Sequence, residues 1–413
     1  CLALHDNNGN GCGQGGYGES QGMYLQQEAT VQAACSSFYY GDGQLKWILK
    51  AMPNLEIPQR NSFLRIHPVF IHKFQTGPEL TPVAPAETEN VSCLPVTDHQ
   101  FAISNNPPEH VTQEGHMVNA SETWQLPEGI GLNTLPQERG FDKLVLRRGY
   151  ECSDAYLIMQ GYQGGFRWQG HMQAANCIVR FFQHSHVWLV QNTSRHSYYD
   201  KNGLLISDGA NDGPMPPIAE RVAIADFDSV ALTSTKVNDY HHTDWTRHLF
   251  WSKPGDGFFV IIDRVSFKAD GPYSLTCSWR TPGHAELEGR RWHSDQGAHR
   301  FTVLSSSTVA STCEVDTDQG GCDPYVLRQR LSGEHQKGDT ESFQNLLIVR
   351  ALEDEETYDL QRLDANSALV RRDGAPVAWC GADIHPDFAW LPHAKANATS
   401  VWVDTHSLAL SGL

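Results

Sequence analysis

Histidines are the residues of this sequence whose spacing most directly suggests chemistry. The chain has 20 of them, and His184 and His186 are two residues apart in a strand-like run. Alternate positions of a strand share one face, so these two imidazoles could bind one metal ion. His241, His242 and Asp244 form a second group with similar ligands. Spacing identifies no third ligand for the first pair, so a bound divalent metal, zinc or calcium, would be structural, and its ligand set is unknown.

Cysteines and sequons indicate the compartment. None of the 10 cysteines forms a C-x-x-C pair, which argues against a zinc site of that kind. Cys313 and Cys322 flank a glycine-rich turn and could form a hairpin disulfide if the compartment is oxidising. Sequons at Asn90, Asn119, Asn192 and Asn397 are compatible with secretion. We expect a secreted protein, extracellular or periplasmic, and a chain that is a processed or truncated product.

The charge balance limits the partners. A formal net charge of -17 with 31 Lys and Arg argues against nucleic acid, because phosphate binding needs a basic face. An acidic polymer could still bind a local basic cleft. Candidates for that cleft are Arg147, Arg148, Arg167, Arg180, Arg195, Arg290 and Arg291. The adjacent pairs have a simpler explanation, because neighbours on a strand point to opposite faces. No apolar run is long enough for a membrane span.

The elements that would position these residues change along the chain. The first region is 1–75, and its residues 17–75 are expected to be helical, because apolar residues recur with a 3.6-residue period between Tyr24 and Phe38. Residues 76–140 hold eight of the 21 prolines and are expected to be a linker or extended wrap with short strands such as HQFAIS. Strand-length runs then predict stacked antiparallel sheets, divided into a central β-sandwich (141–310) and a C-terminal β-sheet region (311–413).

Two stretches resemble the heparinase II/III superfamily of polysaccharide lyases. The segment GGYGESQGMY (15–24) is similar to a helix start of that family, in which a Gly-rich turn and a Glu precede a catalytic Tyr. The segments from FDKLVLRRGY to SWRTPG (141–283) resemble its first β-sandwich in order and spacing. The resemblance implies a mainly β fold with an N-terminal α segment: the last helices of a partial α/α toroid, then a multi-sheet antiparallel β-sandwich.

The resemblance also implies an activity and its residues. Such lyases remove the C5 proton of a uronate and expel the C4 oxygen, so they need a proton carrier at each atom. Tyr24 would be the general base and acid, helped by neighbouring cations that lower its pKa from about 10. His171 would face the cleft from the sandwich, and Tyr199 would supply a second hydroxyl. Substrate contacts would come from Glu19, Asn176, Arg195 and Arg167.

Each assignment has a structural alternative. Tyr24 could be a packed helix residue, His171 a structural or surface histidine, and Asn176 a turn residue at a strand end. Arg195 could be a solvated loop charge. The sequence also departs from the family pattern where a metal is bound, because Gln191 falls where the family has Asp, and Lys201 and Asn202 replace a His-Asn pair. A family-type metal site is therefore expected to be lost or rebuilt.

The predicted function is β-elimination on a uronic-acid-containing acidic polysaccharide, without a redox cofactor. The main alternative is a non-catalytic carbohydrate-binding or scaffold protein on the same fold. A glycoside hydrolase would need two carboxylates across a cleft, and the acidic segments here read as turns and solvated runs. The toroid portion missing from the N-terminal side, or a second copy of the chain, is the protein partner that the resemblance implies.

Overall fold

The structure is a computed structural model that describes most of the chain after residue 134 and little before it. The described residues are 7, 43–44, 81, 83, 90–98, 100–101, 135–162, 175–190, 201–209, 215–216, 218–307, 309–316 and 324–382, with the backbone alone at 400–403 and 407–411. Among them no helix is long and apolar enough to cross a membrane. All strand pairs are antiparallel.

The strands form four sheets. The first sheet has the order β1-β2-β3-β4-β5 and holds β1 (Val91–Pro95), β2 (Phe141–Arg147), β3 (Tyr156–Gln160), β4 (Cys177–Gln183) and β5 (His186–Val190). A 3-10 turn, η2 (Gln137–Arg139), precedes β2. The four-stranded sheet has the order β15-β16-β11-β6 and holds β6 (Leu204–Ser207), β11 (Gly271–Thr281), β15 (Ala310–Val315) and β16 (Tyr325–His335).

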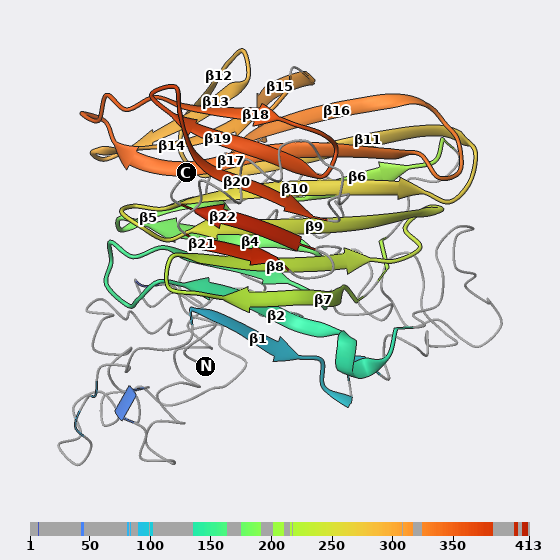
Figure 1. Cartoon of the computed structure of the whole chain (residues 1–413), viewed down its shortest axis with the longest axis horizontal. Helices are drawn as coiled ribbons and strands as arrows, with labels where there is room; N and C mark the ends of the chain where they lie inside the picture. The colour runs from blue at the N-terminus through green and yellow to red at the C-terminus, as the bar shows by residue number, and fades with distance from the viewer. Residues whose placement is uncertain are drawn as a thin grey trace, which may run out of the picture.

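The other two sheets form the centre and one outer layer (Figure 1). The central sheet, β12-β13-β14-β17-β10-β9-β8-β7, holds β7 (Glu220–Asp226), β8 (Val230–Val237), β9 (Thr243–Ser252), β10 (Phe258–Phe267), β12 (Ala285–Glu288), β13 (Arg291–Gln296), β14 (His299–Ser305) and β17 (Thr340–Ala351). The C-terminal sheet, β18-β19-β20-β22-β21, holds β18 (Tyr358–Arg362), β19 (Ser367–Arg372), β20 (Ala375–Ala382), β21 (Ser400–Val403) and β22 (Ser407–Ser411).

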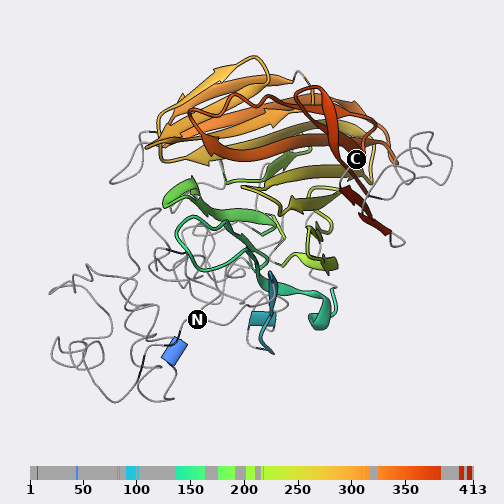
Figure 2. The same ribbon diagram turned by 60° about the vertical axis from the view of Figure 1, so that its left-hand side comes forward.

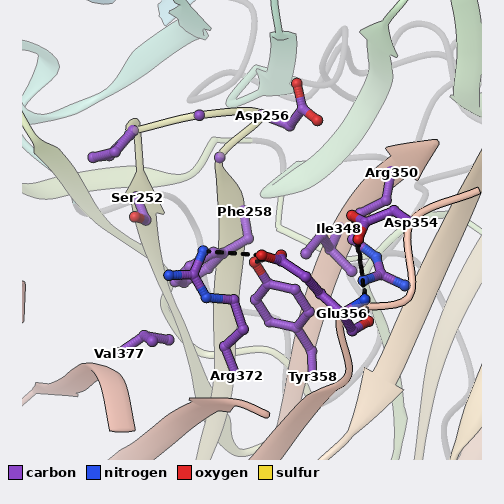
Figure 3. Close-up of a pocket in the computed structure, with 13 residues that line it drawn as sticks. Ser252, Asp256, Phe258, Ile348, Arg350, Asp354, Glu356, Tyr358, Arg372 and Val377 are labelled. Carbon is purple, nitrogen blue, oxygen red and sulfur yellow. Dashed lines mark hydrogen bonds and ion pairs between the residues drawn. The ribbon is translucent and has the colours of Figure 1, made fainter. Parts of the chain in front are cut away.

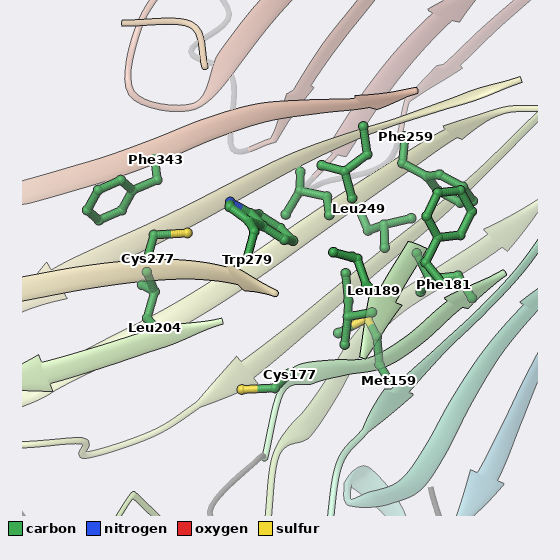
Figure 4. Close-up of a cluster of buried hydrophobic side chains, with 14 of the residues drawn as sticks. Met159, Cys177, Phe181, Leu189, Leu204, Leu249, Phe259, Cys277, Trp279 and Phe343 are labelled. Carbon is green, nitrogen blue, oxygen red and sulfur yellow. The ribbon is translucent and has the colours of Figure 1, made fainter. Parts of the chain in front are cut away.

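Alternation along β10 shows how the central sheet separates two cores. Phe259 and Ile261 face the inner core, which lies between the central sheet and the first and four-stranded sheets (Figures 2 and 4). Val260 and Ile262 face the outer core, which lies against the C-terminal sheet. Successive side chains of a strand point to opposite faces, so a run that is apolar at every position is expected where both faces are buried. The continuous apolar run FFVII therefore follows from a strand packed between two layers.

The predicted multi-sheet antiparallel β fold is confirmed, and one local prediction is wrong. Gln100 and Phe101, expected in a strand, are helical. Thr97 begins this turn through a reciprocal cap: its Oγ1 accepts the Gln100 N–H at 3.2 Å, and Gln100 Oε1 accepts the Thr97 N–H at 2.9 Å. The strand in this region is β1, which ends at Pro95, before HQFAIS (99–104) begins. The toroid helices assigned to residues 1–75 lie outside the described residues, and the domain boundaries stay a prediction.

Candidate functional site

Two segments of the sandwich carry the sequence-predicted site residues. Segment 163–174 contains Arg167 and His171, and segment 191–200 contains Arg195 and Tyr199. These four side chains, like Glu19 and Tyr24, lie outside the described residues. The structure does describe the residues at which each segment leaves the first sheet and returns to it. These flanking residues form the structural base of each segment, and the candidate site is described from the two segment bases.

Hydrogen bonds join the two ends of each segment and hold the two segment bases next to each other. The Asn176 N–H donates to the carbonyl of Gln160 at 2.7 Å, which joins the ends of segment 163–174. The side-chain amide of Asn202 donates to the carbonyl of Val190 at 2.8 Å, which joins the ends of segment 191–200. A bridge between Ile178 and Asn202, with an N–H to O distance of 3.0 Å, links the two bases. Both segments thus start from neighbouring points of one sheet.

A buried arginine ties the two bases to the central sheet. Arg247 Nη1 donates to the carbonyls of Asn176 and Asn202, each at 3.0 Å. Its Nε and Nη2 bind the two carboxylate oxygens of Asp263 at 2.7 and 2.9 Å. Both side chains are fully buried. Burial lowers the pKa of Arg247, but the Asp263 carboxylate outweighs it and the net shift is upward, so the guanidinium stays charged.

Strand register places this ion pair. Arg247 in β9 and Asp263 in β10 are directly opposite partners, so their side chains share the inner face. Trp245, on the same face, donates its indole N–H to Asp263 Oδ1 at 2.8 Å. Sequence reasoning did not single out any of these residues. The available signal was an ionisable residue inside each of two apolar strand runs, TRHLF and VIIDRV, because such a residue needs a partner when buried.

Lys201 and Asn202, followed by Gly203, stand where the resemblance implies a metal-binding pair. The Asn202 side chain also donates to the carbonyl of Ile178 at 3.0 Å and accepts the backbone N–H of Arg280 at 2.7 Å. A Cβ on Gly203 would lie 2.5 Å from Cys177 Sγ, so only glycine fits. Lys201 is buried and cationic. These residues do not fit a zinc ion, because the amide is fully used and the charge has the wrong sign.

Asn176 is the one predicted substrate contact that the structure describes. Its side chain is fully buried, and its Oδ1 accepts a hydrogen bond from Thr235. Its Nδ2 has no acceptor among the described residues. The residue has a positive φ of 64° just before β4, a conformation that asparagine tolerates better than most residues. In the described structure Asn176 therefore closes a turn and braces the site, and its contact with substrate stays a prediction.

The expected metal pair His184 and His186 does not lie on one strand face. His184 and Ser185, with φ of 52° and 63°, form the two-residue turn between β4 and β5. A two-residue hairpin loop favours this left-handed conformation at both positions. His184 stacks on His299 of the central sheet, with ring centroids 4.3 Å apart. The alternation expected of a strand was wrong here because the chain reverses at the first histidine.

Residues of the second histidine group, which was considered for metal binding, are buried or held in ion pairs. His241 is fully buried, and Asp244 is held by Lys236 at 2.8 Å and Lys268 at 2.6 Å. Among the described residues, one group of three side chains brings metal-binding atoms within 4.8 Å of one another: Glu286, Glu288 and His293. These lie on the β12–β13 hairpin. This group was not predicted from the sequence, and its geometry alone does not identify a ligand.

The stacking of His184 on His299 leads us to expect that the stability of the folded protein depends on pH. Burial lowers the pKa of His184, more than Asp256 raises it, so the unfolded chain binds more protons as pH falls below about 6.5. Stability is thus full above that pH and is lost below it. We expect the melting temperature to fall less between about pH 7.5 and about pH 5.5 in His184→Asn than in the parent. His242→Asn, at another positive φ and a more exposed side chain, is the control. Equal losses in parent and His184→Asn would contradict this.

The arginines expected to line a basic cleft do not share one surface in the described part of the chain. Arg147 is buried and Arg148 exposed, as neighbours on a strand should be. Arg180 is buried in β4. Arg290 binds Asp359 of the C-terminal sheet at 2.9 Å.

Cys313, expected in a hairpin disulfide, has a free thiol beside the Trp292 indole N–H at 3.1 Å, and Cys322 lies outside the described residues.

The fold is shared with known lyases. No protein-family model matches the sequence, and no curated protein matches it. Among solved structures, heparan sulfate lyase HepC from Pedobacter heparinus matches with a TM-score of 0.57 and 8% identity, over 91% of this chain and 50% of that one. The chain has a heparinase III-type fold. A structure described as a heparinase III gives a TM-score of 0.55 and 9% identity, also over 91% and 50%. The chain thus spans about half the length of these structures.

Proposed function

We propose that this chain is the C-terminal part of a polysaccharide lyase that cleaves a uronic-acid-containing acidic polysaccharide by β-elimination. The observation that carries the proposal is the pair of bases, at Asn176 and Asn202, held side by side by Arg247 in a heparinase III-type fold. This arrangement places the flanking residues of segments 163–174 and 191–200 next to each other. Those are the segments in which the sequence places four of the predicted site residues.

In this proposal Tyr24 carries the protons. As phenolate it removes the C5 proton, and as phenol it returns a proton to the departing C4 oxygen. His171 polarises the uronate carboxylate or assists the transfer, and Tyr199 supplies a second hydroxyl. Arg195, Arg167, Asn176 and Glu19 hold the sugar. The charge that grows on the carboxylate makes such cationic and hydrogen-bonding partners the groups that lower the barrier.

The buried ion pair has a positioning role. The side chains of Arg247 and Asp263 are fully buried, and Arg247 reaches the two segments through the backbone carbonyls of Asn176 and Asn202. Catalytic groups must be held within fractions of an ångström of their productive positions. We infer that fixing both bases to the rigid central sheet is what makes side chains on two separate segments converge. The chemistry requires no redox cofactor, and a structural zinc or calcium ion elsewhere in a secreted, extracellular or periplasmic protein is compatible with it.

The function can be tested by the absorbance of its product. Eliminative cleavage creates a C4–C5 double bond that absorbs in the ultraviolet. The full-length encoded protein should produce this signal on at least one polymer of a panel of alginate, heparan sulfate, chondroitin sulfate and ulvan. Heat-inactivated protein is the control. No signal on any uronate polymer, under conditions where the protein is folded, would overturn the lyase proposal.

A non-catalytic carbohydrate-binding or scaffold role is the second candidate. It is favoured by one observation: Lys201, a buried cation, and Asn202, a fully used amide, occupy the positions where the family resemblance implies a metal-binding pair. Retained binding of an acidic polysaccharide without any absorbance change would support this role over catalysis.

A further inference from the structure

A pocket opens where the outer core ends, between the central and C-terminal sheets. It has a volume of about 530 Å³ (Figure 3). It adjoins the outer core, whereas Arg247 faces the inner core on the other side of the central sheet. Pockets of this size, at the junction of two packed layers, are where small ligands bind in many proteins.

Strand alternation explains why polar side chains meet here. Ile348 of β17 and Val370 of β19 belong to the outer core. Two residues further along the same faces, these strands present Arg350 and Arg372. Tyr358, at the start of β18, packs edge-on against Phe258 of the central sheet with ring centroids 6.2 Å apart. The apolar layer thus gives way to two guanidinium groups and a phenol.

The two arginines keep unused donors. Arg350 lies 3.5 Å from a carboxylate oxygen of Asp354, and Arg372 lies 3.6 Å from one of Glu356. Both distances exceed those of good charge-assisted hydrogen bonds, so these two carboxylates leave guanidinium N–H groups available for a ligand. Arg372 also hydrogen-bonds the Tyr358 hydroxyl, which joins it to the same wall of the pocket. Arg350 also donates to the backbone carbonyl of Glu356 and lies over the Tyr358 ring, 5.4 Å from its centroid, which fixes it in place.

Tyr358 adds a hydroxyl that stays protonated. Burial, followed by the charge of Glu356, raises its pKa above the ordinary value. The phenol contacts a carboxylate oxygen of Glu356 at 3.4 Å, a long hydrogen bond that a ligand hydroxyl could replace. The pocket therefore combines donors, acceptors and an aromatic ring within one wall (Figure 3).

The charge of the lining selects among ligands. The lining of this pocket holds Arg350 and Arg372 together with three carboxylates, those of Asp256, Asp354 and Glu356. An anionic ligand would gain two cations but meet three like charges at short range, which disfavours it. A neutral ligand with many hydroxyl groups meets no such repulsion. It can accept from the guanidinium groups and donate to the carboxylates at once.

A second hollow extends the pocket. It has a volume of about 180 Å³ and shares Ile348, Arg350, Glu356 and Tyr358 with the first. It adds Arg291, Arg300 and Glu288, so the two hollows together hold four arginines and four carboxylates, a balance that again suits a neutral ligand. The shared residues form the boundary between the two, so one ligand could occupy both. A chain of several sugar units suits this shape better than a monosaccharide.

We propose that this double pocket binds a neutral oligosaccharide, as a second carbohydrate site distinct from the proposed lyase site. Arg372 and Glu356 would bind adjacent hydroxyl groups of one sugar ring, and Tyr358 would contact its apolar face or an adjacent hydroxyl. The pocket lies on the opposite side of the central sheet from the Arg247–Asp263 pair. It would hold the protein on a neutral polysaccharide or on neutral stretches of a mixed polymer. It does not depend on the lyase proposal, because binding is measured without turnover.

The probes are neutral hexasaccharides, namely cellohexaose, mannohexaose and the N-acetylglucosamine hexamer, compared with hexagalacturonate as the acidic probe. Binding is followed by isothermal titration calorimetry and saturation-transfer NMR on the full-length protein. We expect at least one neutral hexamer to bind with a dissociation constant in the micromolar to low millimolar range. Arg372→Ala and Tyr358→Ala should each weaken that binding at least tenfold.

Arg371→Ala is the matched control. Arg371 is the preceding residue of β19, points to the opposite face and binds the side chain of Gln361. It should leave the affinity unchanged. Melting temperatures of all variants show whether they fold, and Tyr358→Phe, which removes only the hydroxyl, serves if Tyr358→Ala does not. The proposal is overturned if no neutral hexamer binds, or if Arg372→Ala binds as tightly as Arg371→Ala. Lyase activity on uronate polymers is measured separately. If it persists in either case, the lyase proposal stands although the second-site proposal fails.

Discussion

Tyr24→Phe is expected to lower kcat for eliminative cleavage by about 10²- to 10⁴-fold, the usual contribution of a positioned proton carrier. The change removes one oxygen atom and leaves a ring of nearly the same size, so the free energy of unfolding should change little. KM should change much less than kcat, because Tyr24 is proposed to act on the proton and not to hold the sugar. Initial rates of the ultraviolet absorbance increase, over a range of polymer concentrations, measure both constants.

Tyr325→Phe provides the comparison for this experiment. Tyr325 begins β16 in the four-stranded sheet and packs against His284, with ring centroids 4.8 Å apart. Loss of its hydroxyl should leave kcat unchanged. If Tyr24→Phe were as active as Tyr325→Phe, the proton-transfer role of Tyr24 would be wrong, whatever the remaining activity of the protein on uronate polymers.

Asp263→Asn should destabilise the sandwich by about 3–5 kcal/mol, the usual cost of leaving a buried charge without its partner. The substitution keeps the shape of the side chain but removes the charge that offsets the burial of Arg247. The amide also cannot accept all three hydrogen bonds that the carboxylate accepts from Arg247 and Trp245. Urea unfolding followed by tryptophan fluorescence measures the loss.

An exposed ion pair of similar geometry separates burial from pairing. Asp295 binds Arg300 through two contacts of 2.7 Å, but about two fifths of each side chain is exposed, at 42% and 44%. Asp295→Asn should therefore cost at most about 1 kcal/mol. If the Arg247–Asp263 pair contributed only as much as a surface pair, the two variants would lose the same stability. Equal losses would therefore refute the role of this pair as the brace of the site.

A double variant addresses the positioning role. In Arg247→Met with Asp263→Leu, apolar side chains replace the whole pair, which often restores much of the stability. The carbonyls of Asn176 and Asn202 would still lose their shared donor. Lyase activity should then stay low while stability partly recovers, which would assign the pair to positioning.

The strand pattern of this protein could be read from local sequence. The run FFVIIDRVSF has strand length, β-branched and aromatic residues and turn residues on both sides, and it forms β10 as expected. Similar runs made the stacked antiparallel sheets predictable. The cap of Thr97 by Gln100 was equally local, yet the β-favouring residues of HQFAIS concealed it. Local signals were thus sufficient for most elements but ambiguous where two of them competed.

The candidate site was determined at a different level. Nothing near Asp263 in the sequence names Arg247 as its partner, since the two meet only because β9 and β10 pair in one particular register. The same holds for Asn176 and Asn202, which are brought together by a single arginine from a third element. His184 and His186 show the converse, because the hairpin turn separates two residues that a strand would have aligned. The sequence by itself determined the class of fold and the residues available for chemistry. The tertiary structure decided which of them meet, because side-chain alternation is a local property of a strand whereas register depends on packing between distant strands.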